Sequence, residues 1–320
     1  MNAPTLTEFM AMHGYDTPPT TRPGCIIRFN APNKPKGNKS AWLRMFEDGG
    51  AIFGSWSTGE EYVYQPNGLN ELDQAQRAQA YLQMQAERAK HQVTIQAQHE
   101  RMANKAFSIW ENVSLANNQH LYLINKRIQS HGAGFIPMFE GYLKDCLIIP
   151  VYGDLGRGSI ELMNLQAIDP NGTKRPLKGA KFKGGFCPIQ WRGNEAPFVI
   201  CEGFATGATL AEHYTKTANV ICAFNAQNLV TVAKYLRHRY HSNQFFIAAD
   251  NDHNTEGNPG LTLATKAAHV AYAEILMPEF KEGEQGSDWN DWHNKREPAN
   301  LADQNQHGFH KKMEASEVSA

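Results

Sequence analysis

The chain has 320 residues, 41% of them hydrophobic, and a net charge of −1, so it is long enough to form two or three globular domains. No stretch approaches the roughly twenty apolar residues that span a bilayer, and residues 1–14 lack the pattern of a secretory signal, so we expect a cytoplasmic protein with no membrane contact. The five cysteines are isolated, with no Cys-x-x-Cys pair, which argues against a zinc ribbon and a disulfide framework.

The first part of the chain is predicted to be a small antiparallel β module behind an irregular lead-in. Residues 1–24 contain four prolines and no clear periodicity, so we expect no regular structure there. Residues 25–68 contain short alternating segments between Pro, Gly, Asn and Asp clusters, which is typical of hairpins. The expected strands are residues 25–29, 41–46, 51–56 and 61–64.

A long helical connector is predicted over residues 69–113. From residue 70 to residue 113 there is no Pro or Gly, and Ala, Gln, Glu, Arg and Met dominate, which favours one long helix or a helical hairpin. The apolar positions are sparse, so we expect the helix to be partly exposed.

Residues 114–195 are predicted to form a mixed α/β subdomain with a basic surface. We expect a helix over residues 122–129 and strands over residues 146–152 and 160–168. The glycine-rich residues 152–158 are interpreted as the tip of a hairpin.

The pattern changes in residues 196–297, where apolar strands alternate with helices. Such alternation predicts parallel βαβ units, that is, a Rossmann-like domain with a central parallel sheet. The fold class is therefore a multi-domain combination of α+β and α/β parts, followed by a flexible tail over residues 298–320. The expected strands are residues 198–201, 220–224, 245–249 and 274–277, and the expected helices are residues 205–215, 227–240 and 261–273.

Three acidic residues follow strands of this predicted sheet. Glu202 follows the first strand, and Asp250 and Asp252 follow the third. If the order is 2-1-3-4, these strands are neighbours and the carboxylates converge at the edge where open parallel sheets carry their sites. Carboxylate oxygens are the ligands that Mg²⁺ prefers and suit phosphoryl transfer. Taken alone, Glu202 or the Asp pair would more often be structural than catalytic, because acidic residues commonly cap helices and end strands.

The motifs around these residues resemble the TOPRIM domain of phage and plasmid primases. They are VICEGFATGATL at residues 199–210, AFNAQNL at residues 223–229 and ADND at residues 249–252. The resemblance implies that Glu202 is a general acid or base near the primer 3′-hydroxyl and that Asp250 and Asp252 hold Mg²⁺ or Mn²⁺. The family places a glycine soon after the Asp pair, whereas here Gly257 and Gly260 come later.

The motif SDWND at residues 287–291 looks like the acidic element that closes the TOPRIM unit. On that resemblance Asp288 is a further metal ligand and Asp291 a possible additional acidic residue. The alternative interpretation is that Ser287 and Asp288 cap a short helix.

A basic segment precedes the acidic part of the chain. Residues 101–200 carry twelve Lys or Arg against seven Asp or Glu, whereas residues 201–300 carry eight against twelve. Within residues 174–192 there is no acid, and the segment resembles the one that precedes TOPRIM in DnaG-type primases. The alternative is an ordinary solvated face. The candidate nucleotide- and template-binding residues are Arg175, Lys178, Lys181 and Lys183.

The β module is similar to the region that precedes TOPRIM in TraC-like conjugative primases, so the resemblance spans most of residues 25–295. DnaG-type primases carry a zinc module, and this sequence has no ligand set for one, so no zinc is expected. The aromatic residues Trp42, Phe53 and Trp56 either stack on unpaired template bases or form the core of the module.

The sequence therefore predicts a Mg²⁺-dependent DNA primase, a nucleotidyltransferase that makes short primers on single-stranded DNA in plasmid or phage replication. Its expected partners are single-stranded DNA, nucleoside triphosphates and a separate replicative helicase, since no Gly-x-x-x-x-Gly-Lys-Ser/Thr loop is present. One alternative is a TOPRIM nuclease or a topoisomerase-like enzyme that cleaves phosphodiesters. The other is a single-stranded-DNA-binding protein without catalysis.

Overall fold

The computed structural model describes residues 4–19, 21–35, 37–47, 49–66 and 74–296. The chain forms two compact units, Met1–Ile95 and Gln96–Ala320, and the boundary lies within helix α2 (Gln74–Glu111). The tail predicted at residues 298–320 lies outside the described residues. Among the helices that are described, none combines the length and the apolar character needed to cross a membrane.

The first unit contains a four-stranded antiparallel meander with the order β1-β2-β3-β4, as the hairpin pattern predicts. Alternate residues of its central strands, such as Leu43 and Phe53, are fully buried and form the core of this unit. The strands are β1 (Ile26–Phe29), β2 (Ala41–Met45), β3 (Ala51–Ser55) and β4 (Glu61–Tyr64).

The prediction that the lead-in is irregular is wrong for helix α1 (Leu6–Met12). Thr5 and Glu8 form a reciprocal capping box, in which each side chain accepts a hydrogen bond from the backbone of the other residue. Met10 of this helix is fully buried in the core of the β module. A helix of seven residues between prolines is too short to be recognised by periodicity, and the burial of Met10 in the core stabilises this helix.

The aromatic residues of the module divide between its core and its surface. Phe53 is buried, as the core interpretation predicts. Trp56 is 47% exposed; its ring stacks on Trp42 at 5.8 Å, and the Arg28 guanidinium lies 4.4 Å from the Trp56 ring centre.

Helix α2 is a single helix of 38 residues, so the hairpin alternative is wrong. In the second unit its last turns bury Ala103 and Ala106 against an antiparallel sheet, while Phe107 stays 53% exposed. This part of the helix is therefore a structural layer of the second unit rather than only a connector.

The antiparallel sheet of the second unit has the order β5-β6-β7-β8-β9. Strands β7 and β8 pair as a hairpin around the glycine-rich tip predicted for residues 152–158. The residues predicted as a helix from 122 to 129 form a shorter one, α3 (Leu121–Lys126), which ends because Arg127 adopts a left-handed conformation with φ 54°. The strands are β5 (Ser114–Leu115), β6 (Gly134–Phe139), β7 (Leu143–Gly153), β8 (Glu161–Ile168) and β9 (Lys174–Pro176).

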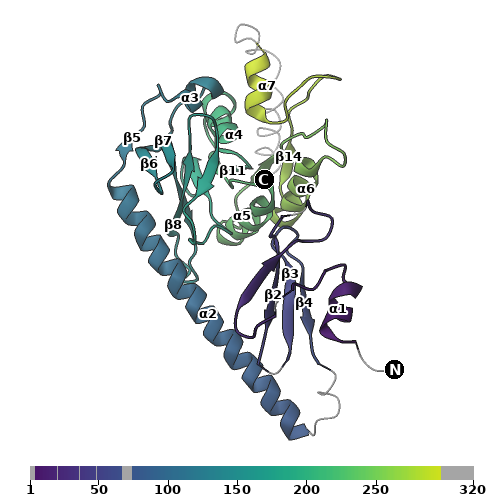
Figure 1. The fold of residues 1–320 in the computed structure, drawn as a ribbon. Coiled ribbons are helices and arrows are strands. Elements are labelled where there is room, and N and C mark those ends of the chain that lie inside the picture. Colours follow the sequence, from purple (N-terminus) through teal and green to yellow (C-terminus); the bar gives the residue numbers. More distant parts are fainter. Residues whose placement is uncertain (1–3, 20, 36, 48, 67–73, 297–320) are drawn as a thin grey trace. The chain divides into compact units, whose positions relative to one another are not determined.

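A second sheet of this unit, with the order β10-β12-β11-β13-β14, contains the predicted parallel strands in the 2-1-3-4 order. Two of its strands, β11 and β14, are labelled in Figure 1. The added edge strand β10 (Cys187–Gln190) is antiparallel. This confirms the predicted fold class, with a central parallel sheet beside a mixed α/β part. The parallel strands are β11 (Phe198–Cys201), β12 (Asn219–Cys222), β13 (Phe245–Ala248) and β14 (Glu274–Leu276).

Alternate residues of the parallel strands face two different helical layers. Phe198 and Ile200 pack with helices α5 (Ala226–Arg239) and α6 (Pro259–Ala271). Val199 and Cys201 pack with helix α4 (Phe204–Thr209), the π-helical turn η2 (Leu210–Tyr214) and helix α7 (Trp289–Lys295). The helix predicted at residues 205–215 is therefore α4 continued by η2.

Candidate functional site

The acidic residues Glu202, Asp250 and Asp252 lie at one edge of the parallel sheet. Strands β11 and β13 are parallel neighbours, with Cys201 opposite Ala248, so the residues that leave both strands emerge side by side. Glu202 comes directly after β11, and the Asp pair follows β13 by two and four residues. The 2-1-3-4 order therefore places all three residues at the same edge of the sheet.

Asp288 reaches this edge through a loop held against the end of β13. The backbone N–H of Asn251 donates to the carbonyl of Ser287 at 2.7 Å, and the Asn251 side chain donates to the carbonyl of Pro278 at 3.0 Å. These bonds place Asp288 beside the Asp pair, although more than thirty residues separate them in the sequence.

The carboxylates interact strongly with one another. Burial, followed by the charges of Glu202, Asp288 and Asp252, raises the pKa of Asp250 well above its ordinary range. Burial and then the charge of Asp252 raise the pKa of Glu202. Burial also raises the pKa of Asp288.

Two lysines provide the opposing positive charge. Lys174, on the edge strand β9, acts against the raised pKa of Glu202, Asp250 and Asp288 alike. Lys126, at the end of α3, lowers the pKa of Asp288 and donates to Asp291 Oδ1 at 3.2 Å. Since both lysines come from the antiparallel part of the second unit, this part completes the electrostatics of the site.

The side chains fit a hard divalent cation in chemistry, although they do not form a finished cluster. Within the part of the chain that the structure describes, no three His, Cys, Asp or Glu side chains meet closely enough to hold one ion. Asp250 Oδ1, however, is covered and has no hydrogen-bond partner, which is a costly state for a carboxylate oxygen. An all-oxygen carboxylate set is the one that Mg²⁺ and Mn²⁺ prefer.

Asp252 also organises the start of helix α6. Its Oδ2 accepts the backbone N–H of Gly260 at 2.9 Å, and its own N–H donates to Asn258 Oδ1 at 3.0 Å. A Cβ at Gly260 would lie 2.8 Å from both Asp252 Oδ2 and the Asp250 carbonyl oxygen. Gly260 is therefore the glycine that allows the close approach to the Asp pair, despite its later place in the sequence.

The structural interpretation of the SDWND motif is also correct, since Asp288 is the N-cap of α7. Its side chain accepts the backbone N–H of Asp291 at 2.7 Å. Asp291 is held by Lys126, so both residues have structural partners in addition to any role in the site. Asn290, between them, is buried and donates to Thr209 Oγ1 and to the Lys126 carbonyl.

The basic segment is not gathered around the carboxylates as a whole. Lys181 Nζ donates to the Asp154 carbonyl at 2.6 Å. Arg175, Lys178 and Lys183 are exposed. We call the sheet edge that carries Glu202, Asp250, Asp252 and Asp288 the acidic edge. Lys174, which the sequence did not distinguish from its neighbours, is the member of the basic segment whose charge acts on this edge.

Asn228 is a buried structural position beside the site that sequence reasoning missed. Its side chain accepts the N–H of Gly184 at 2.7 Å and donates to the carbonyls of Gly185 and Ala223 at 2.6 and 2.8 Å. It thereby fastens the end of the basic segment to the parallel sheet. The AFNAQNL motif contained the signal, because a buried amide at a helix start must find several partners.

Comparison with known proteins places the acidic edge in a known domain. Residues 198–299 match the family model described as Toprim domain. The chain contains a Toprim domain. Glu202, Asp250, Asp252 and Asp288 all belong to this domain, whereas Lys126 and Lys174 precede it.

Curated relatives of the chain extend beyond the Toprim domain. The chain is 30% identical over 258 residues to a protein from Escherichia coli named DNA primase TraC, covering 78% of this chain and 23% of that protein. It is 33% identical over 170 residues to another Escherichia coli DNA primase TraC, covering 51% of this chain and 11% of that protein. The chain thus spans less than a quarter of the length of these relatives.

Two solved structures from bacteriophage T7 are similar to this chain at 14% identity and a TM-score of 0.40. One is the lagging-strand DNA polymerase interacting with primase domains bound to an RNA/DNA hybrid, covering 57% of this chain and 86% of that one. The other is the primase fragment of the primase-helicase protein, covering 54% of this chain and 69% of that one.

Proposed function

We propose that this chain is the catalytic part of a DNA primase, which makes short primers on single-stranded DNA by nucleotidyl transfer in plasmid or phage replication. The observation that carries the proposal is that Glu202, Asp250, Asp252 and Asp288 lie at one edge of the Toprim domain, where the other three charges act on Asp250. The relatives named DNA primase TraC support it, since their similarity to this chain begins well before the Toprim domain. The preceding segment supplies both lysines of the site.

Asp250, Asp252 and Asp288 are the residues that would hold Mg²⁺ or Mn²⁺, and no role for zinc is proposed. A bound divalent ion supplies charge neutralisation to a triphosphate during nucleotidyl transfer. The covered Oδ1 of Asp250, which has no hydrogen-bond partner, is the oxygen that gains most from a cation.

Glu202 is proposed as the general base. Its carboxylate would accept the proton from the 3′-hydroxyl of the growing primer. The raised pKa that burial and Asp252 give this side chain brings its proton affinity closer to neutral pH, where a general base works best.

The nucleotide is proposed to bind next to Lys126 and Lys174. A hollow of about 340 Å³ lies beside the site and is lined by polar groups that include Lys126, Asn171 and Asp291. The exposed Arg175, Lys178 and Lys183 are proposed to hold template phosphates together with Lys181, whose ammonium group also binds the Asp154 carbonyl.

The partners of the chain are proposed to be single-stranded DNA, nucleoside triphosphates and a separate replicative helicase in the cytoplasm.

The test is a primer-synthesis assay with purified protein, a single-stranded DNA template, labelled ribonucleotides and Mg²⁺. Wild type should yield short labelled products, and both Asp250→Asn and Glu202→Gln should lose at least about a hundredfold in rate, as expected for central catalytic groups. Asp145→Asn is the matched control, because Asp145 is an exposed aspartate on β7, outside the Toprim domain.

The other two functions give different results in the same assay. A nuclease would shorten the template and make no labelled product. A binding protein would retard the DNA on a gel, form neither product and be unaffected by both substitutions. Either result contradicts the proposal.

A further inference from the structure

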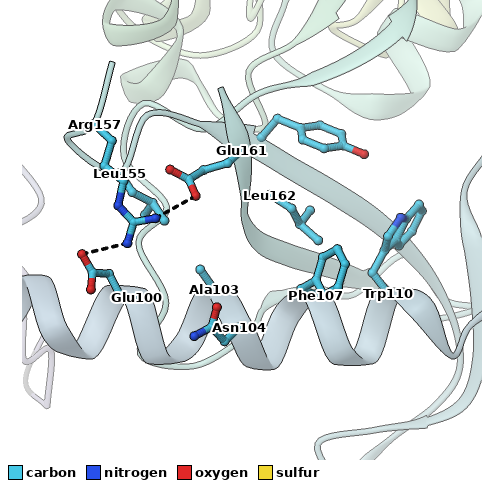
Figure 2. Close-up of a pocket in the computed structure, with 10 residues that line it drawn as sticks. Glu100, Ala103, Asn104, Phe107, Trp110, Leu155, Arg157, Glu161 and Leu162 are labelled. Atoms are coloured by element: carbon cyan, nitrogen blue, oxygen red, sulfur yellow. Dashed lines mark hydrogen bonds and ion pairs between the residues drawn. The ribbon is translucent and has the colours of Figure 1, made fainter. Parts of the chain in front are cut away.

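A second site lies in the same unit but outside the Toprim domain, in a cavity of about 460 Å³. The last turns of α2 form one wall and the hairpin of β7 and β8 forms the other (Figure 2). This volume lies within the range of sites that bind small molecules or single side chains.

The two ends of the cavity differ in chemistry. Glu100, Arg157 and Glu161 lie at one end, and Phe107 and Trp110 lie at the other, with Ala103, Asn104 and Leu162 between them (Figure 2). A ligand that fills the cavity must therefore have a polar head and an apolar body.

The polar end carries an excess of negative charge. Two carboxylates face one guanidinium: Arg157 binds Glu161 Oε2 at 3.3 Å and Glu100 Oε1 at 3.0 Å. Glu100 Oε1 also accepts the side-chain amide of Gln96 at 3.0 Å. The second oxygen of Glu161, Oε1, is covered and has no hydrogen-bond partner. Because Oε1 is covered, a ligand in the cavity cannot reach it. The two carboxylates nevertheless outnumber the guanidinium, and a cation in the cavity would supply the missing positive charge.

We infer that this cavity binds an arginine side chain presented by an apolar segment of a partner protein. Its guanidinium would lie beside the carboxylates of Glu100 and Glu161 at the polar end, and its alkyl stem and the apolar segment would pack on the aromatic end. Nucleic acid is disfavoured, because the cavity lining has a net negative charge that repels phosphate. The inference is independent of the proposed function, since no residue of the acidic edge takes part in it.

The test uses two short probes that differ only in charge. Acetyl-Leu-Arg-amide carries the guanidinium, and acetyl-Leu-citrulline-amide carries a neutral urea of the same shape. Binding is followed through the indole N–H signal of Trp110 in nitrogen-15 correlation spectra, which a Trp110→Phe variant assigns among the six tryptophans.

The arginine probe should shift the Trp110 signal with saturation and bind at least about tenfold more tightly than the citrulline probe. Glu161→Gln should reduce its affinity to that of the citrulline probe, whereas Glu195→Gln, an exposed glutamate outside the cavity, should leave it unchanged. Phe107→Ala should weaken both probes, with little effect on folding because Phe107 is half-exposed.

Three results would overturn the inference. They are equal affinity for the two probes, no shift of Trp110 with either probe, and a saturable shift caused by a single-stranded oligothymidylate that Glu161→Gln does not weaken. The last result would assign the cavity to nucleic acid. Thermal unfolding of each variant separates loss of binding from loss of structure.

Discussion

Asp250 holds a carboxylate in surroundings that disfavour its charge. Its covered Oδ1 has no hydrogen-bond partner, and three other carboxylates act on it. Such a group costs stability in the absence of a cation, which is a common property of residues selected for function.

Asp250→Asn is therefore expected to stabilise the protein in the presence of a chelator. The folded state raises the pKa above the ordinary value of 3.8, so it binds the proton more tightly than the unfolded state, and the charge destabilises the protein increasingly as pH rises above 3.8. At pH 7 we expect the Tm to rise by about 2–4 °C for each kcal/mol relieved. Calorimetry at pH 7 and near pH 3 measures the difference in Tm between the variant and wild type. A difference of the same size at both pH values would contradict the prediction.

Lys174 and Lys183 provide a matched pair in the basic segment. Lys174→Gln removes a cation that acts on three carboxylates. It should lower the rate of primer synthesis about tenfold, which corresponds to a rise of about 1.4 kcal/mol in the activation free energy. It should also move the acidic limb of the pH–rate profile to higher pH, because the charge that lowers the pKa of Glu202 is lost. Lys183→Gln should have a much smaller effect, and equal effects of both variants would show that the segment acts only as a diffuse charge.

At the scale of elements, η2 is held to the turn after α3 by a single carboxylate. Glu212 accepts the backbone N–H of Gln129 at 2.8 Å and contacts His131 Nε2 at 2.6 Å. Burial opposes the charge, but the hydrogen bonds outweigh it and lower the pKa of Glu212 below its ordinary value of 4.5. The carboxylate thus links the antiparallel part of the second unit to the helical layer that carries α7.

Glu212→Gln is expected to lower the free energy of unfolding at pH 7 by about 1–3 kcal/mol, the range for a hydrogen-bonded charge that is lost. A group with a lowered pKa stabilises the protein above pH 4.5, and this contribution disappears as pH falls through the folded-state pKa. The variant and wild type should therefore converge below pH 4.5 in denaturant titrations. Glu274→Gln, on the edge strand β14, is the control, and a constant difference down to low pH would contradict the prediction.

Helix α1 and the cavity beside α2 show which elements the sequence leaves undecided. Helix α1 has seven residues and depends on the burial of Met10 in a sheet formed much later in the chain. The last turns of α2 carry large apolar residues such as Phe107 and Trp110, yet the residues that are buried are Ala103 and Ala106, because alanine allows a near approach to the sheet.

On the scale of the whole molecule, the two units have separate hydrophobic cores. Phe53 lies in the core of the first unit and Phe246 in that of the second, and both are fully buried. Units with separate cores are expected to unfold in separate steps.

Phe53→Ala should therefore lower the midpoint temperature of one calorimetric transition and leave the other unchanged. We expect the free energy of unfolding of the first unit to fall by about 3–5 kcal/mol. Phe246→Ala should lower the midpoint temperature of the other transition, because it likewise removes a buried aromatic side chain. A single transition that shifts as a whole in both variants would mean that the units unfold together.

The sequence by itself determined the parallel sheet and the position of its acidic residues. Alternating strands and helices, together with the right-handed rule for their connections, fix which strand ends share an edge. Glu202, Asp250 and Asp252 come within four residues of the ends of β11 and β13, so the sequence places them at this edge, and the 2-1-3-4 strand order makes them neighbours.

Only the tertiary structure decided which other groups surround them. Lys174 and Lys183 look alike in the sequence, and Asp288 reads equally well as a cap or a ligand. What distinguishes them is the packing of the antiparallel sheet and of α7 against the parallel sheet, through contacts such as Asn251 to Ser287 and Asn228 to Gly184. These contacts join residues far apart in the chain, and because they depend on side-chain fit between finished elements, no local pattern encodes them.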